Sequence, residues 1–252
     1  MSMLDGKTIW LTRPVGQSQS LAASLESSEA AVRSIPMLVI EPLPEDAAIR
    51  ARVLDLDRYN LLFFISTNAA GLGMALIDKY WPQFPAGLDI FAVGPTTAAV
   101  IEDYGLKVCY PDERMSSEAL LALPALANVA GKQALIVRGV GGRELLAGEL
   151  LKRGATVDYL ELYSRQAPEF ASGAIAALAA KDKPDAVIVT SAEALDNLGR
   201  ILEADKVPLA TMPLFVSSNR IAEIARQAGF ARTFTMPGAD DKAIIGSLAE
   251  TL

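Results

Sequence analysis

Short apolar runs alternate with helical patterns along almost the whole chain. Most of the helical patterns begin with Ser, Thr, Asn or Gly, which commonly cap helix starts. This alternation is typical of βα units and predicts an α/β fold with parallel sheets. The predicted strands are Thr8–Thr12, Val32–Ile35, Leu61–Ile65, Asp89–Val93, Lys107–Cys109, Ala134–Val137, Thr156–Tyr159, Ala186–Val189, Pro213–Val216 and Arg232–Phe234.

The chain also resembles itself. GKTIWLTRP near the amino terminus matches GKQALIVRG at an offset of 125 residues. LLFFISTNAAGL matches DAVIVTSAEAL and places Ser66 on Thr190, an offset of 124. FAVGPTTAAVIEDYGL matches LFVSSNRIAEIARQAGF and places Gly94 on Ser217, an offset of 123. Three registers in the same order predict an internal duplication, with each copy carrying the strands of a small α/β unit.

A unit of this size suits a flavodoxin-like sheet, whose ligands bind beyond the carboxyl ends of the strands. The polar side chains and glycines directly after those ends are therefore the candidate binding residues. They are Arg13, Ser66, Thr67, Asn68, Gly94, Thr96, Thr97, Arg138, Gly139, Thr190, Ser191, Ser217, Ser218 and Asn219.

One pair of equivalent segments does not form βα units. SIPMLVIEPLP, from Ser34, and YLELYSRQAP, from Tyr159, contain prolines, which cannot donate to a sheet ladder and favour edge or linker strands. We expect both segments to connect the two domains. A reciprocal exchange of strands between the repeats and a simple tandem arrangement both satisfy this pattern.

The composition of the chain disfavours several classes of function. The net charge of −7 disfavours nucleic-acid binding, which depends on a basic surface. The chain has no histidine, so the usual general base and metal ligand are missing, and no zinc-site, P-loop or hydrolase motif is present. One cysteine, Cys109, and the lack of a signal segment or a clean apolar span predict a cytoplasmic protein without a membrane helix.

Each candidate residue has a structural alternative. The hydroxyl residues are also ordinary helix caps. Arg13 and Arg138 suit carboxylate clamps or surface ion pairs equally well. Tyr163 can protonate a leaving hydroxyl or simply pack a hinge. The acidic pairs Asp112-Glu113 and Asp240-Asp241 are expected at helix starts, where the helix dipole favours negative charge.

A glycine-rich stretch and the whole chain's order of motifs suggest different ligands. Gly139-Val140-Gly141-Gly142 follows a strand but departs from the dinucleotide pattern, so it favours nucleotide binding only weakly. Taken in order, TIWLTRP, FFISTNAA, AVGPTTAAVIEDYG, LIVRGVGGRELLAGELLKRGATVDYLELYSR and VIVTSAEAL resemble the uroporphyrinogen-III synthase family over nearly the whole chain.

The resemblance implies two flavodoxin-like parallel-sheet domains joined by a two-stranded linker. Residues 1–37 and 169–252 would form the first domain, 43–162 the second, and 38–42 and 163–168 the linker strands. This choice would select the exchanged arrangement, with strand-end donors lining a cleft between the domains. The implied enzyme is a cofactor-independent and metal-independent hydro-lyase that closes hydroxymethylbilane, a tetrapyrrole with eight carboxylates, to uroporphyrinogen III with inversion of ring D.

The resemblance also implies site residues. The linker tyrosine of the family falls on Tyr163, a glycine-threonine turn on Gly94, Thr96 and Thr97, and a Thr/Ser pair on Thr190 and Ser191. A second such turn departs from the family at Ser217-Ser218-Asn219. We expect a monomer that makes transient contact with the preceding pathway enzyme. The alternatives are a two-domain small-anion binding protein and a nucleotide-binding flavodoxin-like protein.

Overall fold

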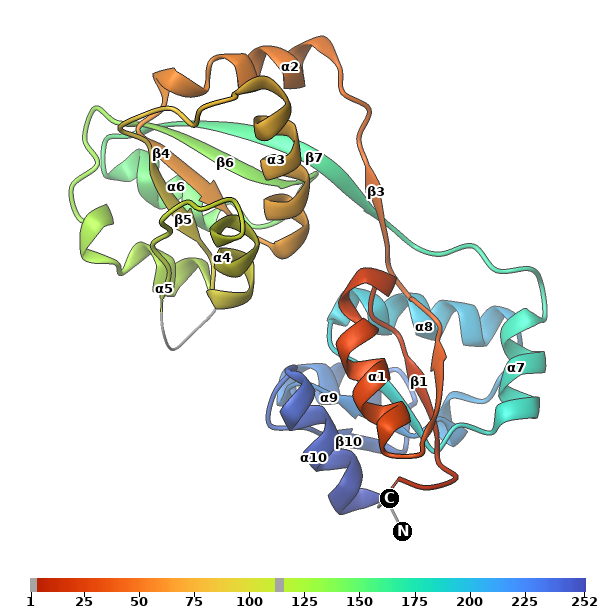
Figure 1. Cartoon of the computed structure of the whole chain (residues 1–252). Coiled ribbons are helices and arrows are strands. Elements are labelled where there is room, and N and C mark those ends of the chain that lie inside the picture. Colours follow the sequence, from red (N-terminus) through yellow and green to blue (C-terminus); the bar gives the residue numbers. More distant parts are fainter. Residues whose placement is uncertain (1–3, 112–115) are drawn as a thin grey trace. The chain divides into compact units, whose positions relative to one another are not determined.

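The described part of the chain folds as two compact units (Figure 1). The computed structural model describes residues 4–111 and 116–252, so the acidic pair Asp112-Glu113 lies outside the described residues. Unit 1 combines the chain up to Ile40 with Gln166–Leu252, and unit 2 is the continuous stretch Glu41–Arg165. The chain therefore crosses from one unit to the other twice.

Unit 1 is built around a five-stranded sheet in the order β10-β9-β8-β1-β2, in which the paired strands are parallel. Numbered along the unit, this is the 2-1-3-4-5 order of flavodoxin-like sheets. Its strands are β1 (Thr8–Leu11), β2 (Ala31–Ser34), β8 (Ala186–Val189), β9 (Leu214–Val216) and β10 (Thr233–Thr235). Its helices are α1 (Gln19–Ser27), α7 (Ala174–Asp182), α8 (Ala192–Ala204), α9 (Asn219–Gln227) and α10 (Asp241–Thr251), with 3-10 turns at Val15–Gln17 and Leu209–Thr211.

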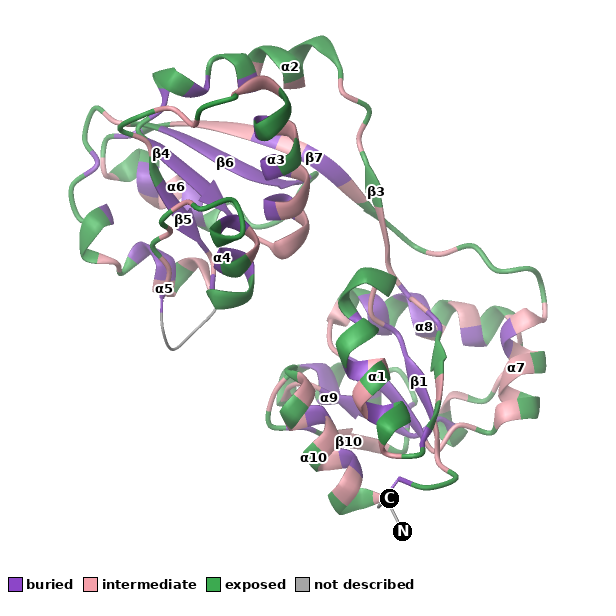
Figure 2. Cartoon of the chain, in the orientation of Figure 1, coloured by how far each residue is buried: buried purple, intermediate pink, exposed green. Residues whose placement is uncertain are grey.

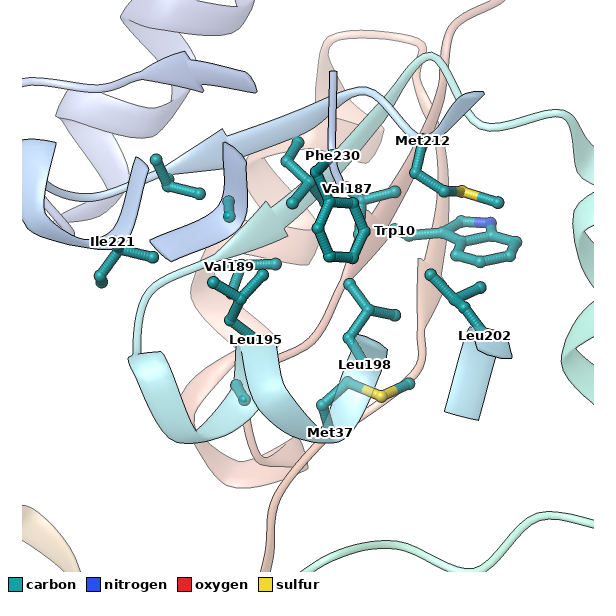
Figure 3. Packing of buried hydrophobic residues seen from close by; sticks show 14 of the residues in the cluster. Trp10, Met37, Val187, Val189, Leu195, Leu198, Leu202, Met212, Ile221 and Phe230 are labelled. Atoms are coloured by element: carbon teal, nitrogen blue, oxygen red, sulfur yellow. The ribbon is translucent and has the colours of Figure 1, made fainter. Parts of the chain in front are cut away.

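Both faces of the unit 1 sheet are covered, which explains why β8 and β9 are apolar at every position and β1 at all positions after Thr8. Trp10 of β1 enters a cluster with Leu198 of α8 and Met212 (Figure 3), while its neighbours Ile9 and Leu11 join α1 and α10 on the other face. Figure 2 shows the resulting buried strands between more exposed helices. The core thus fixes the register that delivers polar residues to the strand ends.

Unit 2 contains a five-stranded sheet in the order β3-β7-β6-β4-β5. The strands are β3 (Val39–Pro42), β4 (Leu61–Phe64), β5 (Asp89–Ala92), β6 (Gln133–Gly139) and β7 (Thr156–Gln166). The helices are α2 (Ala47–Leu54), α3 (Thr67–Tyr80), α4 (Pro95–Glu102), α5 (Ser117–Leu121) and α6 (Leu145–Lys152), with 3-10 turns at Leu56–Arg58 and Pro124–Leu126. α3 approaches the sheet closely at Gly73, where a Cβ atom would lie 2.8 Å from the Phe64 ring.

The two sheets have matching strand orders once the repeat offsets are applied. β9-β8-β1-β2 in unit 1 corresponds to β5-β4-β6-β7 in unit 2. Cys109 forms an isolated bridge to Phe91 of β5, at the place where β10 pairs with β9. This agreement supports the predicted duplication. Because β1 pairs with β8 and β4 pairs with β6, the repeats exchange strands instead of lying in tandem.

The predicted fold class, two parallel-sheet α/β units, is confirmed. Two local predictions need correction. Lys107–Cys109 provides only the bridge at Cys109 and not a full strand. The predicted strand Thr156–Tyr159 is too short, because β7 continues to Gln166 and its ladder with β6 runs up to the pair Gly139 and Tyr163. In residues 4–111 and 116–252, every helix is too short or too polar to span a bilayer.

Candidate active site

A pocket of about 320 Å³ opens in unit 2 beside the carboxyl ends of β4 and β6. This is the edge at which parallel α/β sheets bind ligands. Four elements that are distant in sequence supply its polar walls: the start of α3, the start of α5, the end of β6 with the following turn, and β7. The polar residues of the wall include Ser66, Ser117, Arg138, Arg143, Tyr159 and Tyr163.

Tyr163 is held firmly on β7. Its side chain is buried, with 5% of the residue exposed, and its Oη lies 2.9 Å from Oγ of Ser66. The Ser66 Oγ also accepts a hydrogen bond of 3.0 Å from the N–H of Ala69, because Ser66 caps α3. One serine therefore serves as a helix cap and as the partner of the phenol.

Gly139 forms a flat surface beneath the Tyr163 ring. A Cβ atom on Gly139 would lie 2.5 Å from Cε2 and 2.7 Å from Cζ of Tyr163. The register of β6 and β7 shifts between Arg138 and Gly139, and the N–H of Val140 donates to the carbonyl of Tyr163 at 2.7 Å. Backbone and ring are thus fixed together, and only glycine leaves room for the ring.

Arg138 is a buried cation with 2% exposure, so it is not the surface arginine of the ion-pair alternative. Its role as a carboxylate clamp stays a prediction. Its Nη1 donates to Glu144 at 3.0 Å, its Nε donates to the carbonyl of Gly139 at 3.2 Å, and its Nε lies 3.8 Å from Glu161. Its guanidinium carbon lies 4.6 Å from the centre of the Tyr159 ring, in cation–π geometry. These contacts tie the end of β6 to β7 and to the start of α6.

The hydrogen bonds and burial around Arg138 shift the pKa values of two neighbouring groups, Glu144 and Tyr159. Hydrogen bonds from Tyr159 and then Arg138 lower the pKa of the Glu144 carboxyl below its usual value. Burial, and then the hydrogen bond to that carboxylate, raise the pKa of Tyr159 to about 12. Glu144 is consequently ionised and Tyr159 neutral near pH 7.

The turn after β6 covers the remaining nitrogen of Arg138. Among the described residues, Nη2 is buried without a hydrogen-bond partner. A Cβ atom on Gly142 would lie 3.1 Å from this nitrogen, and Gly141 and Gly142 have φ values of 72° and 102°, which favour glycine. The glycine-rich stretch therefore packs against a guanidinium, which accounts for its glycines without a dinucleotide.

The other predicted residues of unit 2 lie along the same carboxyl edge of its sheet. Thr67 and Asn68 begin α3 and are partly exposed. Gly94 precedes α4 with extended backbone, Thr96 is exposed in the first turn of that helix, and Thr97 is buried at 4% exposure. Of these residues and Ser66, only Ser66 forms part of the pocket wall.

The predicted residues of unit 1 follow β1, β8 and β9 and are largely engaged in local bonds. Ser191 accepts from Ala194 at 3.1 Å and Ser218 accepts from Ile221 at 3.4 Å, as helix caps. Ser217 donates to the carbonyl of Thr190 at 3.1 Å, and Asn219 begins α9.

Arg13 forms an ion pair with Asp241 at 3.3 Å and donates to the carbonyl of Ala239. The neighbouring Asp240 caps α10 by accepting from Ala243 at 2.9 Å, as expected of this acidic pair. Of the two roles considered for Arg13, the structure therefore contains the ion pair. Binding of a ligand by Arg13 and by the unit 1 hydroxyls stays a prediction.

Sequence reasoning missed several polar residues of the pocket, namely Ser117, Arg143, Tyr159 and Arg165, and it considered Gly141 and Gly142 only for nucleotide binding. The segment GGRE directly after a strand, with two adjacent glycines and charges of both signs, was the available signal. Ser117 and Arg165 are distant from that segment in the chain and join it only through tertiary structure.

Comparison with known proteins identifies the family to which this chain is similar. The family model described as "Uroporphyrinogen-III synthase HemD" matches residues 19–246. Relatives named uroporphyrinogen-III synthase from Escherichia coli (strain K12) and Salmonella typhimurium are each 33% identical, with 96% of this chain and 99% of the relative covered.

Solved structures share the fold at low sequence identity. A mutant uroporphyrinogen III synthase from the thermophilic bacterium Thermus thermophilus matches with a TM-score of 0.63 and 16% identity, over 97% of this chain and 100% of that one. The Helicobacter pylori uroporphyrinogen-III synthetase matches with a TM-score of 0.61 and 16% identity, over 95% and 97%. With a family model that spans most of its length, the chain belongs to the uroporphyrinogen-III synthase family.

Proposed function

We propose that this chain is a hydro-lyase that closes hydroxymethylbilane to uroporphyrinogen III, with inversion of ring D and loss of water, and without a cofactor. Support comes from the family match over residues 19–246 and from relatives of this name that align over nearly their whole length. The same match favours the enzyme over a small-anion binding protein or a nucleotide-binding protein.

The observation that carries the chemistry is the buried phenol of Tyr163, 2.9 Å from Ser66 Oγ at the pocket wall. As the C–O bond of the hydroxymethyl group breaks, electrons from the pyrrole nitrogen replace that bond. The phenol gives its proton to the departing oxygen, which leaves as water. Attack by the substituted α-carbon of ring D gives a spiro intermediate. The older bond of that carbon, to the bridge from ring C, then breaks, and the bridge carbon re-bonds to the other α-carbon of ring D, which inverts the ring. That carbon loses its proton, which restores the phenol, so atoms and charge balance.

Positioning contributes more than acid strength in this scheme, because the substrate itself drives ionisation. The pairing of Gly139 with Tyr163 holds the tyrosine, Arg138 donates to the carbonyl of Gly139, and Ser66 orients the hydroxyl of Tyr163. Backbone N–H groups at the starts of α3 and α4, with Thr67, Asn68, Gly94, Thr96 and Thr97, would meet carboxylates of the substrate.

The isomer of the product tests this proposal. Purified protein given freshly prepared hydroxymethylbilane should yield the type III isomer, separated by chromatography after oxidation to the porphyrin. Formation of only the spontaneous type I isomer would refute the proposed function.

A substitution at the phenol tests its role. Tyr163→Phe should reduce kcat by about 10²-fold or more, the range of general acid catalysis, while thermal unfolding changes little. Tyr104→Phe, at an exposed tyrosine, is the matched control and should retain the wild-type rate. An unchanged rate in Tyr163→Phe would assign Tyr163 to packing alone.

We further propose that the chain acts as a cytoplasmic monomer in transient contact with the enzyme that supplies its unstable substrate. The free, exposed Cys109 suits a reducing compartment. Size-exclusion chromatography with light scattering should give one monomeric species of the 26.7 kDa chain.

A further inference from the structure

A second pocket, of about 560 Å³, lies in unit 1 at the amino-terminal ends of β8, β9 and β10. Residues 183–185 come directly before β8 and residues 211–213 before β9, whereas Thr190 and Ser217 follow these strands. The pocket therefore opens at the opposite edge of the sheet from the predicted donors of this unit. Its volume falls in the range of small-molecule sites, about 300–1,000 Å³.

The inner wall of this pocket is apolar and continuous with the core. Ala176, Ala179 and Ala180 of α7 form one side, and Val207 and Met212 form another. Ala179 and Val207 pack against the same buried cluster that contains Met212 and Trp10, and Figure 3 shows Trp10 beside Met212. Short side chains on α7 leave the space open, because alanine fills little of it.

Charged residues of the wall are mainly cationic. Lys183, Lys206 and Arg232 line the pocket, and among the described residues none of the three has an ion pair or a side-chain hydrogen bond. The carboxylate Asp185 also lines it, but Asp185 accepts from the Thr8 N–H at 2.9 Å and pairs with a lysine outside the pocket at 3.7 Å. The chain as a whole is acidic, with a net charge of −7, so these three cations at one pocket make this part of the surface locally positive.

We propose that this pocket binds a small organic carboxylate with a compact apolar body. The apolar body would cover the alanine and methionine wall and exclude water from it. The carboxylate would meet Arg232, whose planar guanidinium matches it, and the two lysines. An inorganic anion would leave the wall uncovered, and a neutral apolar molecule would leave the cations without a partner. The proposal does not depend on the function proposed for unit 2.

Calorimetry with three probes tests this proposal on the full-length protein. Adamantane carboxylate should bind with one site, while its neutral carboxamide and inorganic phosphate should each bind at least about tenfold more weakly. In Trp81→Phe, the remaining tryptophan is Trp10 in the cluster behind Met212, and its emission should change with adamantane carboxylate.

Substitutions locate the site. Lys183→Met with Arg232→Met should weaken binding by about tenfold, because two charged partners are lost while the apolar stems remain. Lys181→Met, at an exposed lysine of α7 that does not line the pocket, is the control and should bind as wild type. Equal binding of the carboxamide, equal binding by the double variant, or no binding of the carboxylate at millimolar concentration would each overturn the proposal.

Discussion

Gly139→Ala is the most direct test of the pocket in unit 2, because the added methyl group would meet the Tyr163 ring. Its Cβ would lie 2.5 Å from Cε2, where carbon atoms in contact normally stay about 3.5–4.0 Å apart. The ring must therefore move by roughly 1 Å. The φ angle of Gly139 is outside the left-handed region, so alanine meets no backbone strain there and the effect is steric.

The backbones of β6 and β7 cannot move apart to relieve this contact without breaking hydrogen bonds between the two strands. Gly139 pairs with Tyr163 across β6 and β7, and the next N–H donates to the Tyr163 carbonyl at 2.7 Å. A ring shift of about 1 Å stretches the 2.9 Å contact with Ser66 beyond hydrogen-bond length. We expect a loss of about 1–3 kcal/mol of stability from overpacking and a fall in kcat of about 10²-fold from the displaced phenol.

The assay combines thermal or urea unfolding with the rate of type III formation. Gly148→Ala is the matched control, because nothing lies within 4 Å of its added methyl group inside α6. It should raise stability by about 0.5–1 kcal/mol and leave kcat unchanged. In a Tyr163→Ala background, Gly139→Ala should lose its stability cost. Wild-type turnover in Gly139→Ala, or a stability cost that persists without the ring, would refute the reasoning.

Three further substitutions test other contacts. Ser66→Ala should cost about 1 kcal/mol of stability as a lost helix cap, and the control Asp46→Ala, at the start of α2, should cost about the same. Only Ser66→Ala should also slow turnover in the isomer assay. Tyr159→Phe should raise the pKa of the Glu144 carboxyl, measured by NMR titration, because the hydrogen bond from Tyr159 lowers it. The stability that this lowered pKa contributes is present above the pKa of the unfolded chain and is lost as pH falls through the pKa of the folded protein. An unshifted Glu144 titration would contradict the hydrogen bond between Tyr159 and Glu144. Asn197→Ala, at 3% exposure, leaves a buried main-chain carbonyl without its 2.7 Å donor and should cost about 1–3 kcal/mol in urea unfolding, with a smaller loss contradicting this account.

Hydrophobic periodicity and the internal repeat predicted the fold well. Both follow the pattern of buried positions along the chain, and this pattern is the same in the two sheets. The strand-end rule also gathered Ser66, Arg138 and Gly139 at one edge before any coordinates, since parallel strands share a direction. The length of β7 was harder to predict. Its outer half has mixed polarity and ends near Pro168, so it has the pattern of a connector, although pairing with β6 continues to Tyr163.

The side-chain contacts of the site could not be predicted from the sequence, because they depend on tertiary structure. Arg138 forms ion pairs with Glu144, which follows the turn after β6, and with Glu161, which lies opposite it on β7. Its near-complete burial depends on the Tyr159 ring and on the turn at Gly142. Hydrophobic periodicity does not indicate which acid or ring a guanidinium will contact, so these contacts required the folded structure.

The exchange of strands between the repeats also has a consequence for the order of folding during synthesis. Unit 2 is complete once Arg165 has been made, and its central pairs join β4 to β5 and β6 within one continuous segment. In unit 1, β1 and β2 cannot complete their sheet until β8 has been synthesised, because Ile9 of β1 pairs with Ala186 of β8. Long-range pairing of this kind is slow. We therefore expect a ribosome-bound chain with a finished unit 2 and an exposed, chaperone-accessible β1 until the last third of the protein emerges.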